Sequence, residues 1–291
     1  MLNLDAGTTS LFQKGAQFVV PRAWLALRVL VCLPRHRQVQ RVLRHPQSAA
    51  LARQYPRMAF KYLNKYVALR LPMKTRRSIF LSHFQFLQRA FKANFLDSVQ
   101  RLSPTLWRQT IEQRAFRVAI ELIAIMGCEG ELRLAFYMDD HEVYRLIFVF
   151  ASGQDFNLSD QTIAIVSGIQ GARDFERVKL ATKTCCDVQP AHILMAALGA
   201  VAEAAHISTI LGPHEKRQLL CGDKSFFSYG GFFEMYGKEI PHQHMYHIGV
   251  PYFHKPILEV KASHRRRNRR KRQFRDDVHA QTAEAIRDYL A

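Results

Sequence analysis

Apolar side chains stand at every second position in two segments that follow Arg114. The apolar positions are Phe116, Val118, Ile120 and Leu122 in the first segment, and Leu132, Leu134 and Phe136 in the second. Because successive side chains of a β-strand point to opposite faces of its sheet, this period predicts two half-buried strands. Apolar runs over Val143–Phe150 and Ile163–Val166 predict two more strands. The short connections between these segments indicate an antiparallel meander.

Helical spacing flanks these strands on both sides. Upstream, phenylalanine and leucine recur every three or four residues, which predicts a helix over Thr75–Phe95. Downstream, helices are predicted over Asp174–Cys185 and Pro190–His206, and the second is apolar nearly all round, so it should be buried against the sheet. A short strand over Ile207–Leu211 follows, and the chain ends in a helix from about Leu258.

This order of elements predicts an α+β fold in which helices pack on a mixed, mainly antiparallel sheet. An α-helical region precedes the sheet, and prolines mark the ends of its helices. Three parts are expected: a basic helical region at 1–110, an α+β core domain at 111–257 and a basic C-terminal helix at 258–291.

Charge divides the chain in the same way. The formal net charge is +18, and no acidic residue lies between Asp5 and Asp97, an interval with 17 Lys or Arg by count. Residues 97–260 hold 15 basic and 19 acidic residues, a net charge of −4, and residues 261–275 add nine basic ones. Positive regions of this kind attract an anionic membrane surface, phosphorylated lipid or, without sequence specificity, nucleic acid.

The densest positive run lies near the C-terminus and is expected to bind anions. Its arginines are Arg265, Arg266, Arg267, Arg269 and Arg270. An anionic lipid surface is favoured over nucleic acid because no nucleic-acid recognition module is visible. The alternative is a solvated run that only aids solubility.

The apolar stretch Ala23–Leu33 is shorter than a membrane span and contains Arg28, and it lacks the pattern of a secretory signal. A cytoplasmic protein is therefore expected, including one peripheral to the inner membrane. The chain has five cysteines without C-x-x-C spacing, which predicts reduced thiols rather than a disulfide framework or a zinc ribbon.

Several blocks of the second half resemble the VirK/YbjX family. They are Ser167-Gly168-Ile169-Gln170-Gly171-Ala172, Ala181-Thr182-Lys183, the aromatic cluster Tyr229, Phe232, Phe233, Glu234 and Gly237, and Ala262-Ser263-His264-Arg265-Arg266. The resemblance covers roughly residues 50 to 280, with Ser228 in place of the family's Asp and Phe233 in place of its Trp. It implies a bacterial envelope-stress protein linked to virulence and to resistance against cationic antimicrobial peptides, and it assigns no molecular activity.

The order of antiparallel strands, a G-x-Q-G turn, a helix and a further strand is also similar to the core of the GCN5-related N-acyltransferases. That resemblance implies that backbone amides after the fourth strand hold the pyrophosphate of an acyl-coenzyme A, and an acyl carrier protein is a related donor. The matching residues are Gly168, Gln170, Gly171, Ala172 and Arg173. A tight strand-to-helix turn without a ligand is the alternative.

If acyl transfer occurs, Glu234 is the candidate base, and Tyr229 or His214 is the candidate acid for the leaving thiolate. Burial among aromatic residues is expected to raise the pKa of Glu234. A non-catalytic binder of anions is the alternative function. Four histidines at 242, 244, 247 and 254 are interpreted as surface residues rather than metal ligands, because no partner ligands have fixed spacing to them.

Overall fold

A computed structural model describes residues 33–123, 128–219, 228–252 and 256–291. The chain divides into two compact units, Met1–Arg37 and Gln38–Ala291. Helix α2 (Leu33–Leu43) crosses this boundary, and all later elements belong to the second unit. The expected subdivision at residues 110 and 258 stays a prediction.

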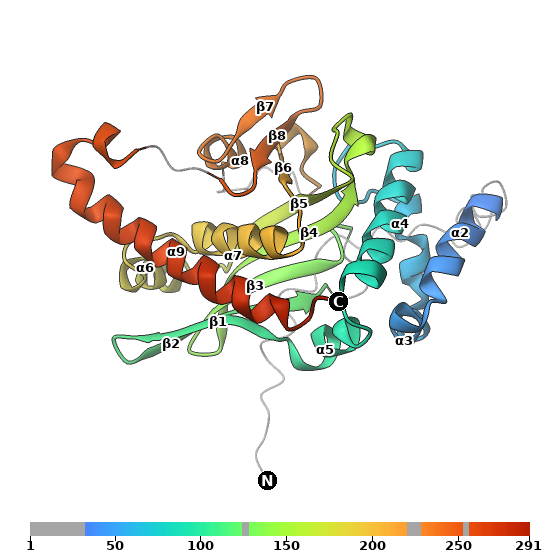
Figure 1. The fold of residues 1–291 in the computed structure, drawn as a ribbon, viewed down its shortest axis with the longest axis horizontal. Helices are drawn as coiled ribbons and strands as arrows, with labels where there is room; N and C mark the ends of the chain where they lie inside the picture. Colours follow the sequence, from blue (N-terminus) through green and yellow to red (C-terminus); the bar gives the residue numbers. More distant parts are fainter. Residues whose placement is uncertain (1–32, 124–127, 220–227, 253–255) are drawn as a thin grey trace, which may run out of the picture. The chain divides into compact units, whose positions relative to one another are not determined.

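The second unit is built on one sheet with the strand order β1-β2-β3-β4-β5-β6-β8-β7 (Figure 1). Its strands are β1 (Thr105–Ile111), β2 (Arg114–Leu122), β3 (Leu132–Met138), β4 (His141–Ser152), β5 (Thr162–Gly171), β6 (Thr209–Pro213), β7 (Lys238–Ile240) and β8 (Met245–Gly249). Neighbours pair antiparallel except β5 and β6, which are parallel. The predicted α+β class and the antiparallel meander are confirmed. Strands β1, β7 and β8 were not predicted, because they lack the alternation of apolar and polar residues that marks β2 and β3.

Helices precede, connect and follow the strands. They are α3 (Pro46–Gln54), α4 (Met73–Ala90), α5 (Phe95–Leu102), α6 (Phe175–Thr184), α7 (Pro190–Ala204), α8 (Tyr229–Phe233) and α9 (Arg265–Arg287), with 3-10 turns η1 (Pro56–Leu63), η2 (Gly153–Phe156), η3 (Glu215–Arg217), η4 (Ile257–Glu259) and η5 (Ala262–His264). The helix predicted over Thr75–Phe95 is α4, which ends at Ala90, and Phe95 begins α5. The terminal helix starts at Arg265 rather than near Leu258. Within the described residues, no helix combines the length and the hydropathy needed to cross a bilayer.

One face of the sheet is apolar and lies under α7 and α9. Strand β3 turns its leucines, Phe136 and Met138 to this face, and all of them are buried. Trp107 of β1 stacks on Phe136 and meets Phe274 of α9 edge to face, at 5.8 Å between ring centroids. Helix α7 is buried along nearly its whole length, as its all-round apolar sequence predicts. In Figure 1 both helices lie in front of the strands.

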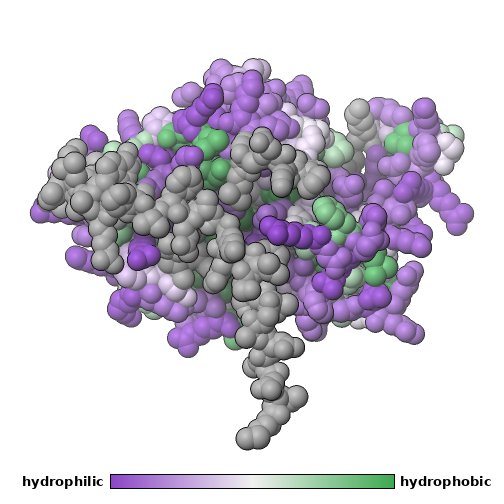
Figure 2. Space-filling view, turned by 180° about the vertical axis from the view of Figure 1, so that it is seen from behind, coloured by the Kyte–Doolittle hydropathy of each residue, from purple (hydrophilic) through white to green (hydrophobic). Residues whose placement is uncertain are grey.

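The opposite face of the sheet carries a row of ion pairs across β2, β3 and β4. Arg133 lies 2.5 Å from Glu121 and 3.5 Å from Glu142, and Arg145 lies 2.6 Å from Glu142. These residues alternate with the buried apolar positions, so the period of two places them together. Figure 2 views the molecule from this side, and most of the surface that is not grey is hydrophilic. The two faces of the sheet therefore differ sharply in chemistry.

Helix α4 packs its aromatic face on β4, and a buried histidine joins the two elements. His83 stacks on Phe150 at 5.7 Å, and the backbone N–H of Phe150 donates a 3.1 Å hydrogen bond to His83 Nδ1. Burial, with a smaller effect of Lys61, lowers the pKa of His83 to about 3. The folded protein therefore holds His83 neutral.

The stability of the protein should fall in acid because of His83. Its folded pKa lies below the unfolded value of 6.5, so its contribution is complete above pH 6.5 and is lost as the pH falls toward about 3. His83→Leu leaves the Phe150 N–H without its acceptor and should lower the free energy of unfolding at pH 7.5 by about 1–3 kcal/mol. Urea unfolding at pH 7.5 and pH 5 measures the difference in free energy of unfolding between the parent and His83→Leu, which should be smaller at pH 5. His141→Leu, at an exposed position, is the control and should give the same difference at both pH values. A constant difference for His83→Leu as well contradicts the assignment.

Candidate functional site

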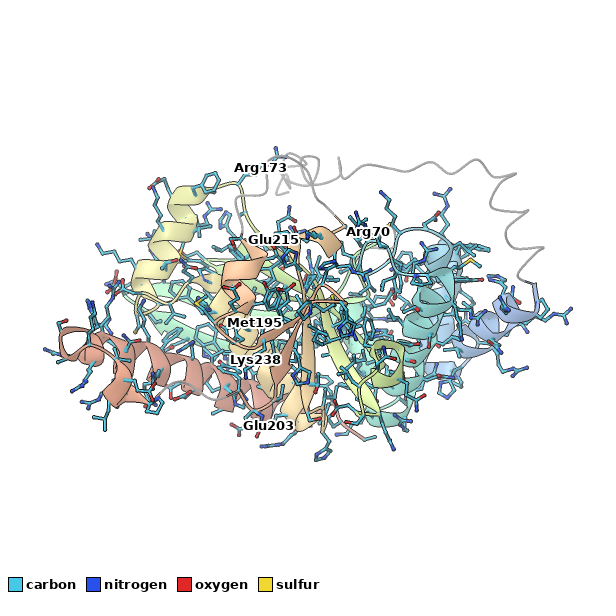
Figure 3. The ribbon with its side chains drawn as sticks, turned by 90° about the horizontal axis from the view of Figure 1, so that it is seen from above. Arg70, Arg173, Met195, Glu203, Glu215 and Lys238 are labelled. Carbon is cyan, nitrogen blue, oxygen red and sulfur yellow. The ribbon has the colours of Figure 1, made fainter. Side chains whose placement is uncertain are left out.

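Strands β5 and β6 pair over only two residues and then separate. The parallel ladder joins Ala164 to Ile210 and Ile165 to Leu211. Beyond it, β5 continues along β4 as far as Gly171, while β6 continues along β8. Both strands end at the same side of the molecule, where Figure 3 shows Arg173 and Glu215, with Glu203 on the other side. Among the described residues, no strand pairs with this edge of β5 beyond the two-residue ladder.

A β-bulge in β5 lies next to the point of separation. Phe148 pairs with Val166 and Ile147 with Gly168, so Ser167 is an extra residue in β5. Its hydroxyl donates a 3.2 Å hydrogen bond to the carbonyl of Ile147. The predicted turn at Gly168–Ala172 is therefore wrong: the segment as far as Gly171 is strand, because its backbone pairs with β4. A bulge re-aims the residues around it, which is one reason why bulges occur at functional sites.

Tyr229, at the start of α8, occupies the gap between β5 and β6. Its hydroxyl accepts a 2.7 Å hydrogen bond from the N–H of Ile169 and donates a 2.9 Å bond to the carbonyl of the same residue. Burial raises the pKa of Tyr229 well above its usual value, so the phenol stays protonated. Among the predicted catalytic residues, Tyr229 lies at the predicted glycine segment and contacts it directly.

Glu129 stands over the bulge. Its carboxyl atoms lie 3.5–3.6 Å from the place that a β-carbon on Gly168 would occupy, so glycine leaves the room for this carboxylate. Burial raises the pKa of Glu129 to about 7, although nearby Arg145 acts to lower it. A carboxyl group that is half ionised near neutral pH has the property required of a general base. Glu129 also influences the pKa of Tyr229, which reflects their proximity.

Lys61 and Tyr66 hold the short segment that carries Glu129. Lys61 Nζ lies 2.9 Å from Glu131 Oε2 and the Tyr66 hydroxyl lies 2.9 Å from Glu131 Oε1, with all three side chains buried. The N–H of Val67 donates to the carbonyl of Cys128 at 2.8 Å. The segment Cys128–Glu131 is thereby fixed at both ends, and Glu129 lies between them.

Glycine is required at position 130 of this segment. Gly130 has a φ of +153°, and a β-carbon there would approach Val149 Cγ1 to 2.9 Å and Ser167 Oγ to 3.3 Å. The backbone conformation and the close approach to β4 and β5 both exclude a side chain. The segment therefore crosses the polar face of the sheet in direct contact with the bulge.

His214 and Glu234 lie in a second cluster, around Tyr246. His214 stacks on Tyr246 at 6.2 Å, and the Tyr246 hydroxyl is hydrogen-bonded to Glu234. Glu234 is exposed, so the expectation that aromatic residues would enclose it is wrong. Glu234 is the residue after the end of α8 and is exposed, whereas Phe232 and Phe233 within the helix are buried.

Glu215 connects the two clusters. Its Oε1 accepts a 2.6 Å hydrogen bond from the N–H of Gly230, the residue after Tyr229, and its Oε2 lies 3.3 Å from His214 Nε2. Burial acts to raise the pKa of Glu215, but the bond from Gly230 and the other local effects outweigh it, and the pKa is lowered. The ionised carboxylate anchors the start of α8 and so helps to hold Tyr229 in the gap.

The backbone amides predicted to hold a pyrophosphate lie near the start of α6, where acidic side chains already serve the N–H groups of the helix. The Asp174 side chain caps this helix and accepts a 3.0 Å hydrogen bond from the N–H of Arg177, and Glu176 adds a second acidic residue in the first turn. A helix N-terminus favours anions, and here the chain supplies its own. Of the predicted residues, Gln170 and Arg173 are exposed and Gly171 lies under the ring of Tyr144, 2.6 Å from where its β-carbon would be. Ala172 leads from β5 into this loop, and its role stays a prediction.

The arginines at the start of α9 differ in their surroundings. Arg265 donates to the carbonyls of Val260 and Leu258, both at 2.9 Å, and Arg267 lies 3.0 Å from Asp187. Arg270 is hydrogen-bonded to Cys186. Arg266 and Arg269 are exposed, and the first turn of α9 contains no acidic residue to offset the positive end of the helix dipole.

The thiols and histidines singled out in the sequence are only partly covered by the structure. Cys128, Cys185 and Cys186 are free, while Cys32, Cys221 and His254 lie outside the described residues. Across the described ranges, no group of three or more His, Cys, Asp or Glu side chains is placed to hold a metal ion.

Sequence reasoning missed Glu129 and Lys61, and it connected Tyr66 only loosely with the family resemblance, without a role. The available signal was the pair of acidic residues in Cys128-Glu129-Gly130-Glu131, which stands between two alternating segments. Local patterns cannot show that a residue about 70 positions upstream pairs with Glu131. The Lys61 contact is therefore a product of the tertiary fold.

Glu129 should give the protein a pH-dependent stability of the opposite sign to His83. Its folded pKa of about 7 exceeds the ordinary 4.5, so the folded state binds more protons between these values and the free energy of unfolding falls as the pH rises through this window. Glu129→Gln cannot ionise. It should therefore be more stable than the parent by roughly 3 kcal/mol at pH 8, with the difference vanishing near pH 4.5.

Chemical denaturation across pH 4.5–8 measures this difference. Glu176→Gln is the control, because its carboxylate is exposed and lies in the first turn of α6. Removing that charge should destabilise the protein slightly at pH 8, the opposite of the effect expected for Glu129→Gln. A Glu129→Gln variant no more stable than the parent at pH 8 would contradict the raised pKa of Glu129.

Comparison with known proteins gives one match. The model of the family described as "Protein of unknown function (DUF535)" matches residues 17–284. No curated protein and no solved structure matches the chain. The expected membership of a family of unknown function is confirmed, while the VirK/YbjX name and its link to virulence and peptide resistance stay predictions.

Proposed function

We propose that the chain is an acyltransferase. It would use the thioester of acyl-coenzyme A or of an acyl carrier protein to acylate an amine. The chain belongs to the DUF535 family, whose function is unknown, so the proposal rests on the geometry of the site. One observation carries this proposal. A carboxyl group with a pKa near 7, Glu129, stands over a bulged strand at the place where two parallel strands separate. The sequence order of antiparallel strands, helix and further strand, on which the resemblance to the GCN5-related N-acyltransferases rests, also supports the proposal.

The open edge of β5 suits the pantetheine arm that coenzyme A and acyl carrier proteins share. This arm is extended and contains two amide groups, so it can add to a strand edge through backbone hydrogen bonds. Ile169 offers both a donor and an acceptor at this edge, and the Tyr229 hydroxyl now satisfies both. A bound thioester would take over these two bonds and leave the Tyr229 hydroxyl beside the ligand.

The residues support a direct transfer without a covalent enzyme intermediate. Glu129 would accept a proton from the ammonium form of the acceptor, and the resulting neutral amine nitrogen would attack the thioester carbonyl. The new C–N bond forms as the C–S bond breaks, and Tyr229 would protonate the departing thiolate. The nitrogen then passes a second proton to Tyr229 through solvent, and Glu129 releases its proton to water, so the products are an amide, a free thiol and one proton.

This chemistry fits the wider role that the sequence resemblance implies. A VirK/YbjX-like envelope-stress protein could resist cationic peptides by acylating a lipid or peptide amine, which removes a positive charge. The activity would operate in the cytoplasm or at the inner membrane. An amine or a hydroxyl acceptor would need a base such as Glu129. We favour the amine because only its acylation removes a positive charge.

Native mass spectrometry of the purified protein with acetyl-, octanoyl- and palmitoyl-coenzyme A, and with acyl carrier protein, tests the proposal. A thioester complex should form, and Glu129→Gln should keep it while lowering acyl transfer to a panel of amines by about 10²–10⁴-fold. Glu234→Gln separates the two candidate bases: a loss there, with Glu129→Gln active, would return the role to Glu234. Absence of any thioester complex removes the acyltransferase proposal.

The exposed arginines of α9 support a second function, binding to an anionic lipid surface. Arg266 and Arg269 are exposed at the positive end of a helix dipole, which is unfavourable without an anionic partner. In Figure 1 this end of α9 lies away from the strands, so it is accessible to a flat surface. The function needs no catalysis and is compatible with the first.

Replacing these two arginines should weaken vesicle binding. Arg266→Ala with Arg269→Ala should cost about 1 kcal/mol per charge on vesicles containing phosphatidylglycerol, and added salt should reduce the loss. Arg267→Ala is the matched control, since Asp187 already neutralises this arginine, and its effect should be smaller. If Arg267→Ala lost as much binding free energy per charge as the Arg266→Ala and Arg269→Ala pair, the lipid assignment would be contradicted. Tighter binding to an oligonucleotide than to vesicles would also contradict it.

A further inference from the structure

Three cationic side chains gather beyond the end of β6. Lys216 and Arg217 lie in η3, and Arg70 lies in the loop before α4. The two segments are bonded to each other: the N–H of Leu69 donates a 2.7 Å hydrogen bond to the carbonyl of Arg217, and Arg217 Nη1 donates a 3.0 Å bond to the carbonyl of Leu69. Figure 3 shows Arg70 and Glu215 on the same side of the molecule. Arg70, Lys216 and Arg217 therefore form one basic cluster.

The basic cluster lacks an acidic ion-pair partner among the residues that the structure describes. Arg70 and Lys216 are exposed, whereas Arg217 is partly buried and also donates from Nε to the carbonyl of Gln243 at 3.0 Å. Burial lowers the pKa of Arg217, and the charge of Arg70 adds to this effect. The two guanidinium groups therefore lie close enough to repel each other, and a bound anion would relieve that repulsion.

Two carboxylates near the basic cluster do not neutralise it. Glu215 is bonded to the backbone at the start of α8 and lies 3.3 Å from His214. Glu239 acts to raise the pKa of His244, but desolvation and the positive charges of η3 outweigh it, and the pKa is lowered. Uncompensated cations disfavour the charged form of a nearby imidazole in this way. The electrostatic potential at this surface is therefore positive.

The basic cluster is joined to the segment that carries Glu129. The residues Tyr66–Arg70 run from this segment to η3, because the first two are hydrogen-bonded to Cys128–Glu131 and the fourth is hydrogen-bonded to Arg217. Arg70 therefore follows directly on the residues that position the candidate base.

The basic cluster is also joined to Tyr229. Gln218 follows Arg217, and its buried side chain is hydrogen-bonded to Tyr229. The Tyr229 hydroxyl in turn bonds the N–H and the carbonyl of Ile169 on β5. The basic cluster is thus connected to both residues to which the proposed mechanism assigns a proton transfer.

We infer that the basic cluster binds the phosphate group next to the pantetheine arm of the thioester donor, an identity that rests on the proposed acyl transfer. Coenzyme A and acyl carrier proteins share this phosphate, which lies at the end of the arm opposite the thioester. An arm along the open edge of β5, with its thioester at Glu129, carries its phosphate beyond the strand ends, where the cluster lies. Arginine bonds a phosphate through two parallel N–H groups, and lysine adds a further positive charge. The site differs from the backbone amides predicted after β5, where Asp174 already supplies an anion.

Calorimetric titration of the full chain with phosphopantetheine and pantetheine tests this site, because the two compounds differ only in the phosphate. Phosphopantetheine should bind at least about tenfold more tightly. Arg70→Gln with Lys216→Gln, the cluster variant, should remove most of this preference, while Arg217 is kept because it bonds two backbone carbonyls. Arg266→Gln with Arg269→Gln is the matched control, since it removes the same charge from exposed positions of α9 and should leave the preference unchanged.

Coenzyme A and phosphopantetheine-bearing acyl carrier protein, titrated in the same way, distinguish the two sources of the phosphate. The natural donor should bind more tightly than the other and should lose about tenfold in affinity in the cluster variant. No preference for phosphopantetheine over pantetheine, or equal losses in the two double variants, overturns the inference. Pyrophosphate binding that only the cluster variant loses, without any thioester complex, removes acyl transfer and with it the donor assignment. Acyl transfer whose KM for the thioester is unchanged in the cluster variant retains the enzyme and removes this phosphate site.

Discussion

The buried ion pair between Lys61 and Glu131 is the interaction on which the proposed site depends. Their atoms lie 2.9 Å apart, and their side chains are only 7% and 4% exposed. Each charge needs the other, because an unpaired charge at this depth costs about 3–5 kcal/mol. The pair fixes Cys128–Glu131 against the sheet and thereby holds Glu129 over Gly168. A structural ion pair thus determines where a titratable carboxyl group lies.

The two faces of the sheet explain why such a site can exist beside a stable core. Burial of apolar side chains under α7 and α9 stabilises the fold from one face of the sheet. The other face can therefore carry a row of charged residues from Glu121 to Arg145. The short parallel ladder between β5 and β6 then exposes backbone groups at the centre of the sheet. The Tyr229 hydroxyl satisfies the N–H and carbonyl of Ile169 among these groups.

Periodicity predicted the parts of the fold that rest on local contrast between apolar and polar positions. Strands β2 to β5 and the buried helix α7 appear where the sequence places them, because side-chain period reports burial directly. The predicted glycine turn was wrong because Gly168 and Gly171 serve close contacts inside a strand, with Glu129 and Tyr144, rather than a bend. Tyr229 was anticipated through the family resemblance. Glu129 was not, since its environment is created by residues far away in the chain.

The ionisation of Glu129 is the property that links the buried ion pair, the bulge and the proposed chemistry. Carbon-13 NMR of protein labelled at the glutamate side-chain carboxyl carbon, with the Glu129 signal assigned by its loss in Glu129→Gln, measures it directly. The account predicts a titration midpoint near pH 7, in line with the effect of burial. A midpoint near 4.5, the ordinary value for glutamate, would contradict it.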